Sequence, residues 1–130
     1  MSLQHVRDRI TAAEAAAGRP AGSVTLVAVS KVQPEDRVEA VLFAGQRVFG
    51  ENRVQEADAR WTPRRERFAD LELHLVGPLQ TNKVNRALEL LDAIQSLDRP
   101  KLARKLAEAA QARGACPRLF VQVNTDEEPQ

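Results

Sequence analysis

Five short strand-like segments recur along the chain, and their starts lie 21 to 26 residues apart. They occupy residues 24–30, 47–52, 71–77, 92–96 and 118–124. The first, VTLVAVS, is rich in valine and too short for a buried helix, which predicts a strand covered on both faces. The stretches between the segments have the three- and four-residue spacing of amphipathic helices. The sequence therefore predicts an α/β domain of parallel strands joined by helical crossovers.

The helices have recognisable ends. Pro34 and Pro100 suit the first turn of the helices that follow the first and fourth strands, with Asp98 as an N-cap for the latter. The pair Thr62-Pro63 is typical of a helix restart. An additional helix is predicted before the first strand, and its buried face would consist of Leu3, Val6, Ile10, Ala13 and Ala17.

Two architectures fit this alternation, an open doubly wound sheet and a (β/α) barrel. Periodicity alone does not choose between them. A complete barrel has eight strands and about 250 residues. The chain has 130 residues and stops at TDEEPQ, just after the fifth predicted strand, so a barrel of this sequence would be incomplete.

Composition excludes several classes of function. The 19 basic and 18 acidic residues leave a net charge of +1, and aromatic residues make up 4% of the chain, which argues against nucleic-acid binding. No apolar stretch approaches the length of a membrane span, and the N-terminal sequence lacks the apolar region of a secretory leader. The single cysteine, Cys116, cannot form an intrachain disulfide and is expected to be a small buried residue. We therefore expect a cytoplasmic protein without nucleic-acid or membrane partners.

Polar side chains follow the predicted strands at the edge where parallel α/β sheets bind ligands. Lys31 comes directly after the first strand, and an unprotonated lysine amine can form a Schiff base with a carbonyl compound. A solvated lysine at a strand end is the alternative interpretation. The next strand runs into Phe49-Gly50-Glu51-Asn52, in which Asn52 could be a binding residue or a helix N-cap.

The third strand runs into HLVGPLQTNK, which brings the amides of Gln80 and Asn82 and the ammonium of Lys83 to the same edge. His74 lies inside this strand, where a satisfied hydrogen bond is the simpler expectation. The segment after the fourth strand, residues 96–99, is interpreted as a helix cap.

Five sequence blocks occur in a characteristic order: LVAVSK (26–31), AGQRVFGENRVQE (44–56), HLVGPLQTNK (74–83), QSLDR (95–99) and FVQVN (120–124). This series resembles the pyridoxal phosphate homeostasis protein family, whose fold is similar to the barrel domain of alanine racemase. The resemblance covers essentially the whole chain. It implies a partial (β/α)8 TIM barrel with about five of its eight strands, a single domain over residues 1–130 that is incomplete at its C-terminus.

The resemblance also implies a cofactor, pyridoxal 5'-phosphate, and the residues that bind it. Lys31 matches the family lysine that holds the cofactor as a Schiff base, and Asn52 matches the asparagine beside its ring. Gly77 and Gln80 would line the rim of the site. No catalytic residue and no metal site are expected, because the family maintains the intracellular supply of the cofactor without known turnover.

Two alternatives remain at this point. A racemase of the alanine racemase type resembles this barrel, but its second base is a tyrosine, and this chain has no tyrosine. A fragment without independent cofactor binding is the other alternative, because the family's phosphate-binding loops have no counterpart in this sequence. The full-length family is expected to be monomeric. For this chain we expect weaker cofactor binding and self-association along the unpaired edge of the fifth strand.

Overall fold

The computed structural model describes residues 2–125, and its centre is one sheet of five parallel strands. The strands are β1 (Ala28–Val29), β2 (Val48–Glu51), β3 (Glu72–Leu75), β4 (Ala93–Leu97) and β5 (Arg118–Val121). Their spatial order is the same as their order in the sequence. A doubly wound sheet would reverse its order at a switch point, so the prediction of a partial barrel is confirmed.

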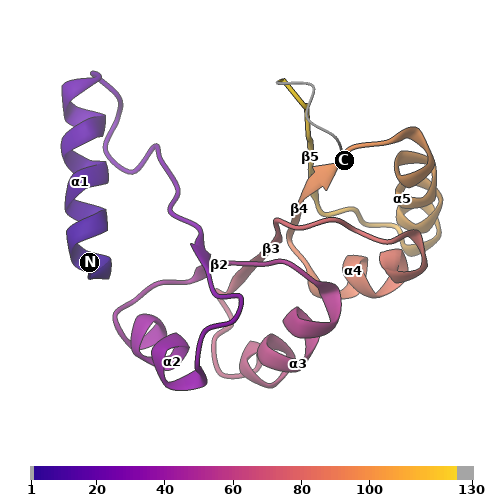
Figure 1. The fold of residues 1–130 in the computed structure, drawn as a ribbon, viewed down its shortest axis with the longest axis horizontal. Coiled ribbons are helices and arrows are strands. Elements are labelled where there is room, and N and C mark those ends of the chain that lie inside the picture. Colours follow the sequence, from indigo (N-terminus) through magenta and orange to yellow (C-terminus); the bar gives the residue numbers. More distant parts are fainter. Residues whose placement is uncertain (1, 126–130) are drawn as a thin grey trace.

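The helices between the strands lie on one side of the sheet. They are α2 (Glu35–Phe43), α3 (Val54–Arg65), the short 3-10 helix η1 (Thr81–Lys83), α4 (Val84–Leu90) and α5 (Pro100–Arg113). Figure 1 shows α2 to α5 following the outer side of the curved sheet, while its opposite side stays open. None of the helices within residues 2–125 is long and apolar enough to cross a membrane.

The main core lies between the sheet and this helical layer. Phe49 of β2 packs against Trp61 of α3, with ring centroids 4.4 Å apart, and both side chains are buried. Successive strand residues point to opposite faces, so Gly50 faces the open side. A Cβ at Gly50 would meet the side chains of Val27, Val29 and Val76.

A polar network spans the open face of β3, β4 and β5. The amide nitrogen of Gln95 lies 2.8 Å from Nδ1 of His74, and Nε2 of His74 lies 2.7 Å from a carboxylate oxygen of Glu72. Arg118 donates to the same carboxylate at 2.9 Å. The expectation that His74 is a buried strand residue with hydrogen-bond partners for its ring is confirmed. The hydrogen bond from His74, together with the charge of Arg118, lowers the pKa of Glu72 below its usual value.

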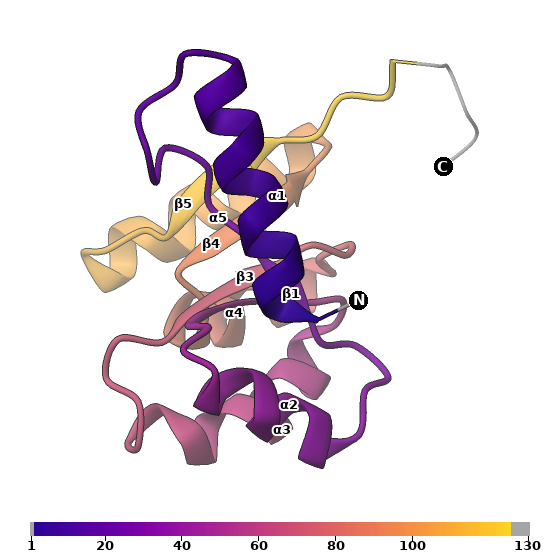
Figure 2. The same ribbon diagram turned by 90° about the vertical axis from the view of Figure 1, so that its left-hand side faces the viewer.

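The N-terminal helix α1 (Leu3–Ala16) departs from the predicted burial. It lies near the β1 end of the sheet, apart from the layer formed by α2 to α5 (Figures 1 and 2), so the face carrying Val6 and Ile10 is only half-buried. Arg7 attaches it to the domain by donating to Oε1 of Gln46 at 2.8 Å. Its buried residue is Glu14, whose carboxylate accepts from the backbone N–H of Val24 at 2.9 Å.

The prediction that the first strand is covered on both faces is wrong. Val24 and Val29 are 39% and 47% exposed, because β1 forms one edge of the sheet and its inner side is open. The residues of β5, at the other edge, are exposed as well. Cys116 was expected to be buried but is exposed just before β5.

Two predicted helix ends also differ. Arg99, not Asp98, is the N-cap residue of α5, and the Asp98 carboxylate instead accepts from the Arg99 guanidinium at 2.7 Å. No helix restarts at Thr62-Pro63, because α3 continues through Pro63. Pro63 lies near the end of α3, so its missing N–H removes a single bond from the last turn.

An ion pair between α3 and α4 predicts that the free energy of unfolding depends on pH. Arg86 donates to both carboxylate oxygens of Asp58, at 2.8 and 2.5 Å. These hydrogen bonds, with one from Thr62, lower the pKa of Asp58 from 3.8 to about 2. A carboxyl group with a lowered pKa in the folded state stabilises the fold fully above its unfolded pKa, and this contribution is lost as the pH falls through the folded pKa of about 2.

We therefore expect Asp58→Asn to lower the free energy of unfolding at pH 7 by about 0.5–1 kcal/mol, because the pair is partly exposed to solvent. The difference from the wild type should shrink steadily as the pH falls from about 4 toward about 2, and urea denaturation at a series of pH values measures it. Asp70→Asn is the control, since the Asp70 side chain is 72% exposed and should contribute little. An equal loss at pH 7 and pH 2 would contradict the assignment.

Candidate functional site

The carboxyl ends of β1, β2 and β3 form a continuous rim. The hydrogen bonds between neighbouring strands continue one residue past the strand ends. Ser30 donates its N–H to the Gly50 carbonyl at 3.0 Å, and Val76 donates its N–H to the Glu51 carbonyl at 2.9 Å. The three motifs that the sequence singled out therefore end side by side, as expected for parallel strands.

A cavity of about 390 Å³ opens on this rim between the ends of β2 and β3. Its volume is within the range of about 300–1,000 Å³ that is usual for small-molecule sites. Its lining consists of Asn52, Arg53, Val54, Gln55, Pro78, Gln80 and Lys83. The structure thus brings together two of the predicted binding residues, Asn52 and Gln80, with the Lys83 ammonium beside them.

Gly77 directly precedes Pro78, one of the lining residues, and packs against the backbone of Asn52. A Cβ at Gly77 would lie 2.3 Å from the carbonyl oxygen of Asn52, far inside van der Waals contact. The chain after β3 can therefore press against the backbone of Asn52 only because residue 77 is glycine. Gly77 is not among the residues that line the cavity, and what the structure shows for it is this close packing against Asn52.

The cavity carries positive charge. Neither Arg53 nor Lys83 forms an ion pair within residues 2–125. Helix α3 begins at Val54, and its N-cap residue Arg53 makes no side-chain capping bond. The interpretation of Asn52 as an N-cap is therefore wrong, and the amide of Asn52 has no capping role. Arg53 and Gln55 also line the cavity and were not predicted, although their position directly after Phe49-Gly50-Glu51-Asn52 indicates this edge of the sheet.

Lys31 lies elsewhere on the rim. It is exposed, in the turn after β1, and it is not among the residues that line the Asn52–Gln80 cavity. The following residue, Val32, has a φ of 56°, a left-handed backbone conformation that is unfavourable for a β-branched residue. The structure thus leaves Lys31 accessible at the end of β1, outside the lining of the cavity that contains Asn52 and Gln80.

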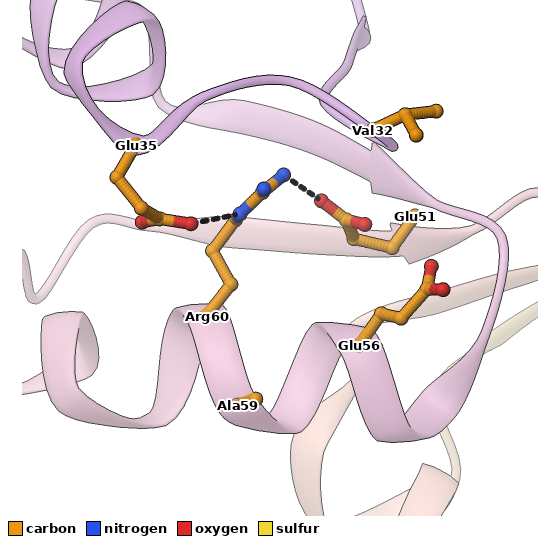
Figure 3. Close-up of a pocket in the computed structure, with 6 residues that line it drawn as sticks. All are labelled: Val32, Glu35, Glu51, Glu56, Ala59 and Arg60. Carbon is orange, nitrogen blue, oxygen red and sulfur yellow. Dashed lines mark hydrogen bonds and ion pairs between the residues drawn. The ribbon is translucent and has the colours of Figure 1, made fainter.

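A second cavity, of about 370 Å³, lies beside the turn after β1, since Val32 of that turn is one of its lining residues (Figure 3). Its lining is Val32, Glu35, Glu51, Glu56, Ala59 and Arg60. Glu51 is 2% exposed and accepts hydrogen bonds from the Ser30 hydroxyl, from Trp61 Nε1 at 3.2 Å and from Arg60 at 3.2 Å. The sequence placed Glu51 on the rim but gave no sign that its carboxylate turns toward α3.

Comparison with known proteins supports the resemblance found in the sequence. The chain is 36% identical over 129 residues to the pyridoxal phosphate homeostasis protein of Vibrio cholerae and 37% identical over 128 residues to that of Escherichia coli K12. Each alignment covers 98% of this chain, and the chain spans about 55% of the length of each relative. No family model matches the chain.

Solved structures give the same result. PipY of Synechococcus elongatus, solved with pyridoxal phosphate bound, is 40% identical, with a TM-score of 0.78 over 95% of this chain and 56% of PipY. A protein of unknown function from Bifidobacterium adolescentis is 37% identical, with a TM-score of 0.87 over 98% of this chain and 55% of its own. The predicted resemblance to the pyridoxal phosphate homeostasis proteins is confirmed, and the chain is their homologue over nearly its whole length.

The contact between Gly77 and Asn52 predicts a specific defect. Gly77→Ala should lower the free energy of unfolding by about 2–3 kcal/mol, because the obstacle is a backbone oxygen that cannot rotate away. It should also shift the backbone amide resonances of Asn52 and Arg53 in a heteronuclear NMR spectrum.

Gly18→Ala is the matched control for this substitution. Gly18 has a φ of +69°, and a Cβ added there would have no heavy atom within 4 Å, so alanine incurs only the left-handed backbone penalty, about 1 kcal/mol. Amide shifts at Asn52 of the same size in both variants would rule out the proposed steric role of Gly77.

Proposed function

We propose that this chain, a homologue of the pyridoxal phosphate homeostasis proteins, binds pyridoxal 5'-phosphate at the rim of its sheet and holds it as a Schiff base on Lys31. The observation that carries the proposal is the exposed Lys31 amine at the end of β1, on the same rim as Asn52 and Gln80. The pyridoxal phosphate bound to PipY, a 40% identical relative, supports the choice of cofactor.

The chemistry of the rim suits this cofactor. Pyridoxal phosphate supplies an aldehyde, which condenses with a primary amine and releases water, and an aromatic ring that withdraws electrons. Lys31 would provide the amine. The side-chain amides of Asn52 and Gln80 would offer hydrogen bonds to polar groups of the cofactor, and Gly77 would keep the backbone of Asn52 close to the site.

We further propose a role in cofactor homeostasis without turnover. Curated relatives are named as homeostasis proteins and not as enzymes. A cytoplasmic location fits the exposed free thiol of Cys116, since reducing compartments keep such thiols unpaired.

Chemical trapping tests the assignment of Lys31. When the protein is incubated with pyridoxal phosphate and reduced with borohydride, peptide mapping should find the label on Lys31. Lys31→Arg keeps the positive charge but removes the primary amine, so it should abolish this label. Lys83→Arg is the control and should leave the labelling of Lys31 in place. Label spread evenly over Lys83, Lys101 and Lys105 would refute the proposal, and absence of label would favour a chain without independent cofactor binding.

A further inference from the structure

We propose that Arg60 and Glu51 act as a clamp that positions Lys31, by holding residues 30–33 in a strained turn from the side of α3. This Arg60–Glu51 clamp rests on the proposed role of Lys31. Neither residue would touch the cofactor. Arg60 is thus assigned as a positioning residue that acts through the backbone on both sides of Lys31.

The turn needs an external partner to keep its shape. Gln33 closes it by donating its N–H to the Ser30 carbonyl at 3.2 Å. Inside it, Val32 has a left-handed backbone conformation, and the residue is 92% exposed. Burial of Val32 therefore does not compensate for the unfavourable conformation. Strained residues of this kind persist only where surrounding contacts fix them, and they cluster at functional sites.

Arg60 supplies those contacts from α3. Its guanidinium donates to the carbonyl oxygens at both ends of the turn, to Ser30 through Nη1 and to Gln33 through Nη2 at 2.7 Å. The side chain is only 14% exposed, so little water competes for these bonds. A planar guanidinium with several fixed donors can bridge two carbonyl groups, which a lysine ammonium does less well.

Glu51 in turn fixes the guanidinium. Its carboxylate lies 3.2 Å from Arg60 Nη1 and accepts from the Ser30 hydroxyl and from Trp61, so it joins the turn, β2 and α3. Figure 3 shows Arg60 between Glu51 and Glu35, with Val32 on the turn above Glu51. Glu35 binds Arg60 Nε at 2.9 Å. Although burial raises its pKa, hydrogen bonds from Arg64 and Arg60 together keep the pKa of Glu35 below its usual value.

The arrangement separates two requirements of a reactive lysine. The Lys31 amine must stay accessible to the cofactor aldehyde, while its Cα must hold one position so that the amine arrives in the correct orientation. The clamp fixes the backbone from the helix side and leaves the rim side free. Loss of Arg60 should release the turn without removing any group that contacts the cofactor.

The experiment compares Arg60→Gln and Arg60→Lys with the matched control Arg64→Gln. Arg64 lies one turn further along α3 and pairs with Glu35 and Glu39, and its hydrogen bonds do not go to residues 30–33. Two quantities are measured: the exchange rate of the Gln33 amide hydrogen without cofactor, and the initial rate of borohydride trapping of pyridoxal phosphate on Lys31.

We expect Arg60→Gln to accelerate Gln33 exchange and to slow trapping on Lys31 by about tenfold, as fits the loss of two charge-assisted hydrogen bonds. Arg60→Lys should fall between the wild type and Arg60→Gln, and it provides the test if Arg60→Gln does not fold. Arg64→Gln should change either quantity less than about twofold. Adding Val32→Gly to Arg60→Gln should recover part of the trapping rate, because glycine adopts the left-handed conformation freely.

Equal exchange and trapping rates in the Arg60 and Arg64 variants would overturn the clamp. Failure of the proposed function looks different, because the wild type itself would then not be labelled on Lys31. Gln33 exchange is measured without cofactor, so it still decides whether Arg60 holds the turn in that case. Unchanged exchange in Arg60→Gln would overturn the inference whatever the labelling result.

Discussion

The rim of the sheet depends on one buried carboxylate, that of Glu51. Strand alternation turns this side chain into the helical layer beside Phe49 and Trp61, where an uncompensated charge would be very unfavourable. Three donors, from Ser30, Arg60 and Trp61, satisfy it. The ion pair with Glu51 therefore places the guanidinium of Arg60 beside the turn after β1. From there the guanidinium binds the backbone carbonyl groups of Ser30 and Gln33 in that turn.

The same strand supplies a second, different surface at its next residue. Asn52 faces the cavity shared with Gln80 and Lys83, and its carbonyl group lies against Gly77. Residues at the end of β2 therefore contact both the turn that contains Lys31 and the segment that begins at Gly77. On the side of Lys31, the buried carboxylate of Glu51 holds Arg60 against the turn after β1. On the side of Gln80 and Lys83, the backbone of Asn52 packs closely against Gly77. A shift of β2 along its axis would disturb both at once.

Much of this arrangement could be predicted from sequence because it depends on local patterns. The strand order follows from the regular alternation of strands and helices, and the gathering of Asn52 and Gln80 follows from parallel strands ending at one edge. Arg60 could not be predicted, since it reaches carbonyl groups 27 and 30 residues away in sequence. The burial of Val24 and Val29 was predicted wrongly because periodicity does not reveal which strand lies at the edge of a sheet.

The division of the rim has a physical rationale under the proposed role of Lys31 as the amine that forms the Schiff base. A hydrogen bond or ion pair to the Lys31 amine itself would hold it in place, but that contact would compete with its reaction. Holding the backbone on both sides of Lys31 avoids the competition. The cost is a left-handed Val32, and it is offset in the helical layer by a charge pair that the fold already requires around Glu51. An exposed amine and a fixed backbone are therefore compatible in this chain because they depend on opposite faces of the same turn.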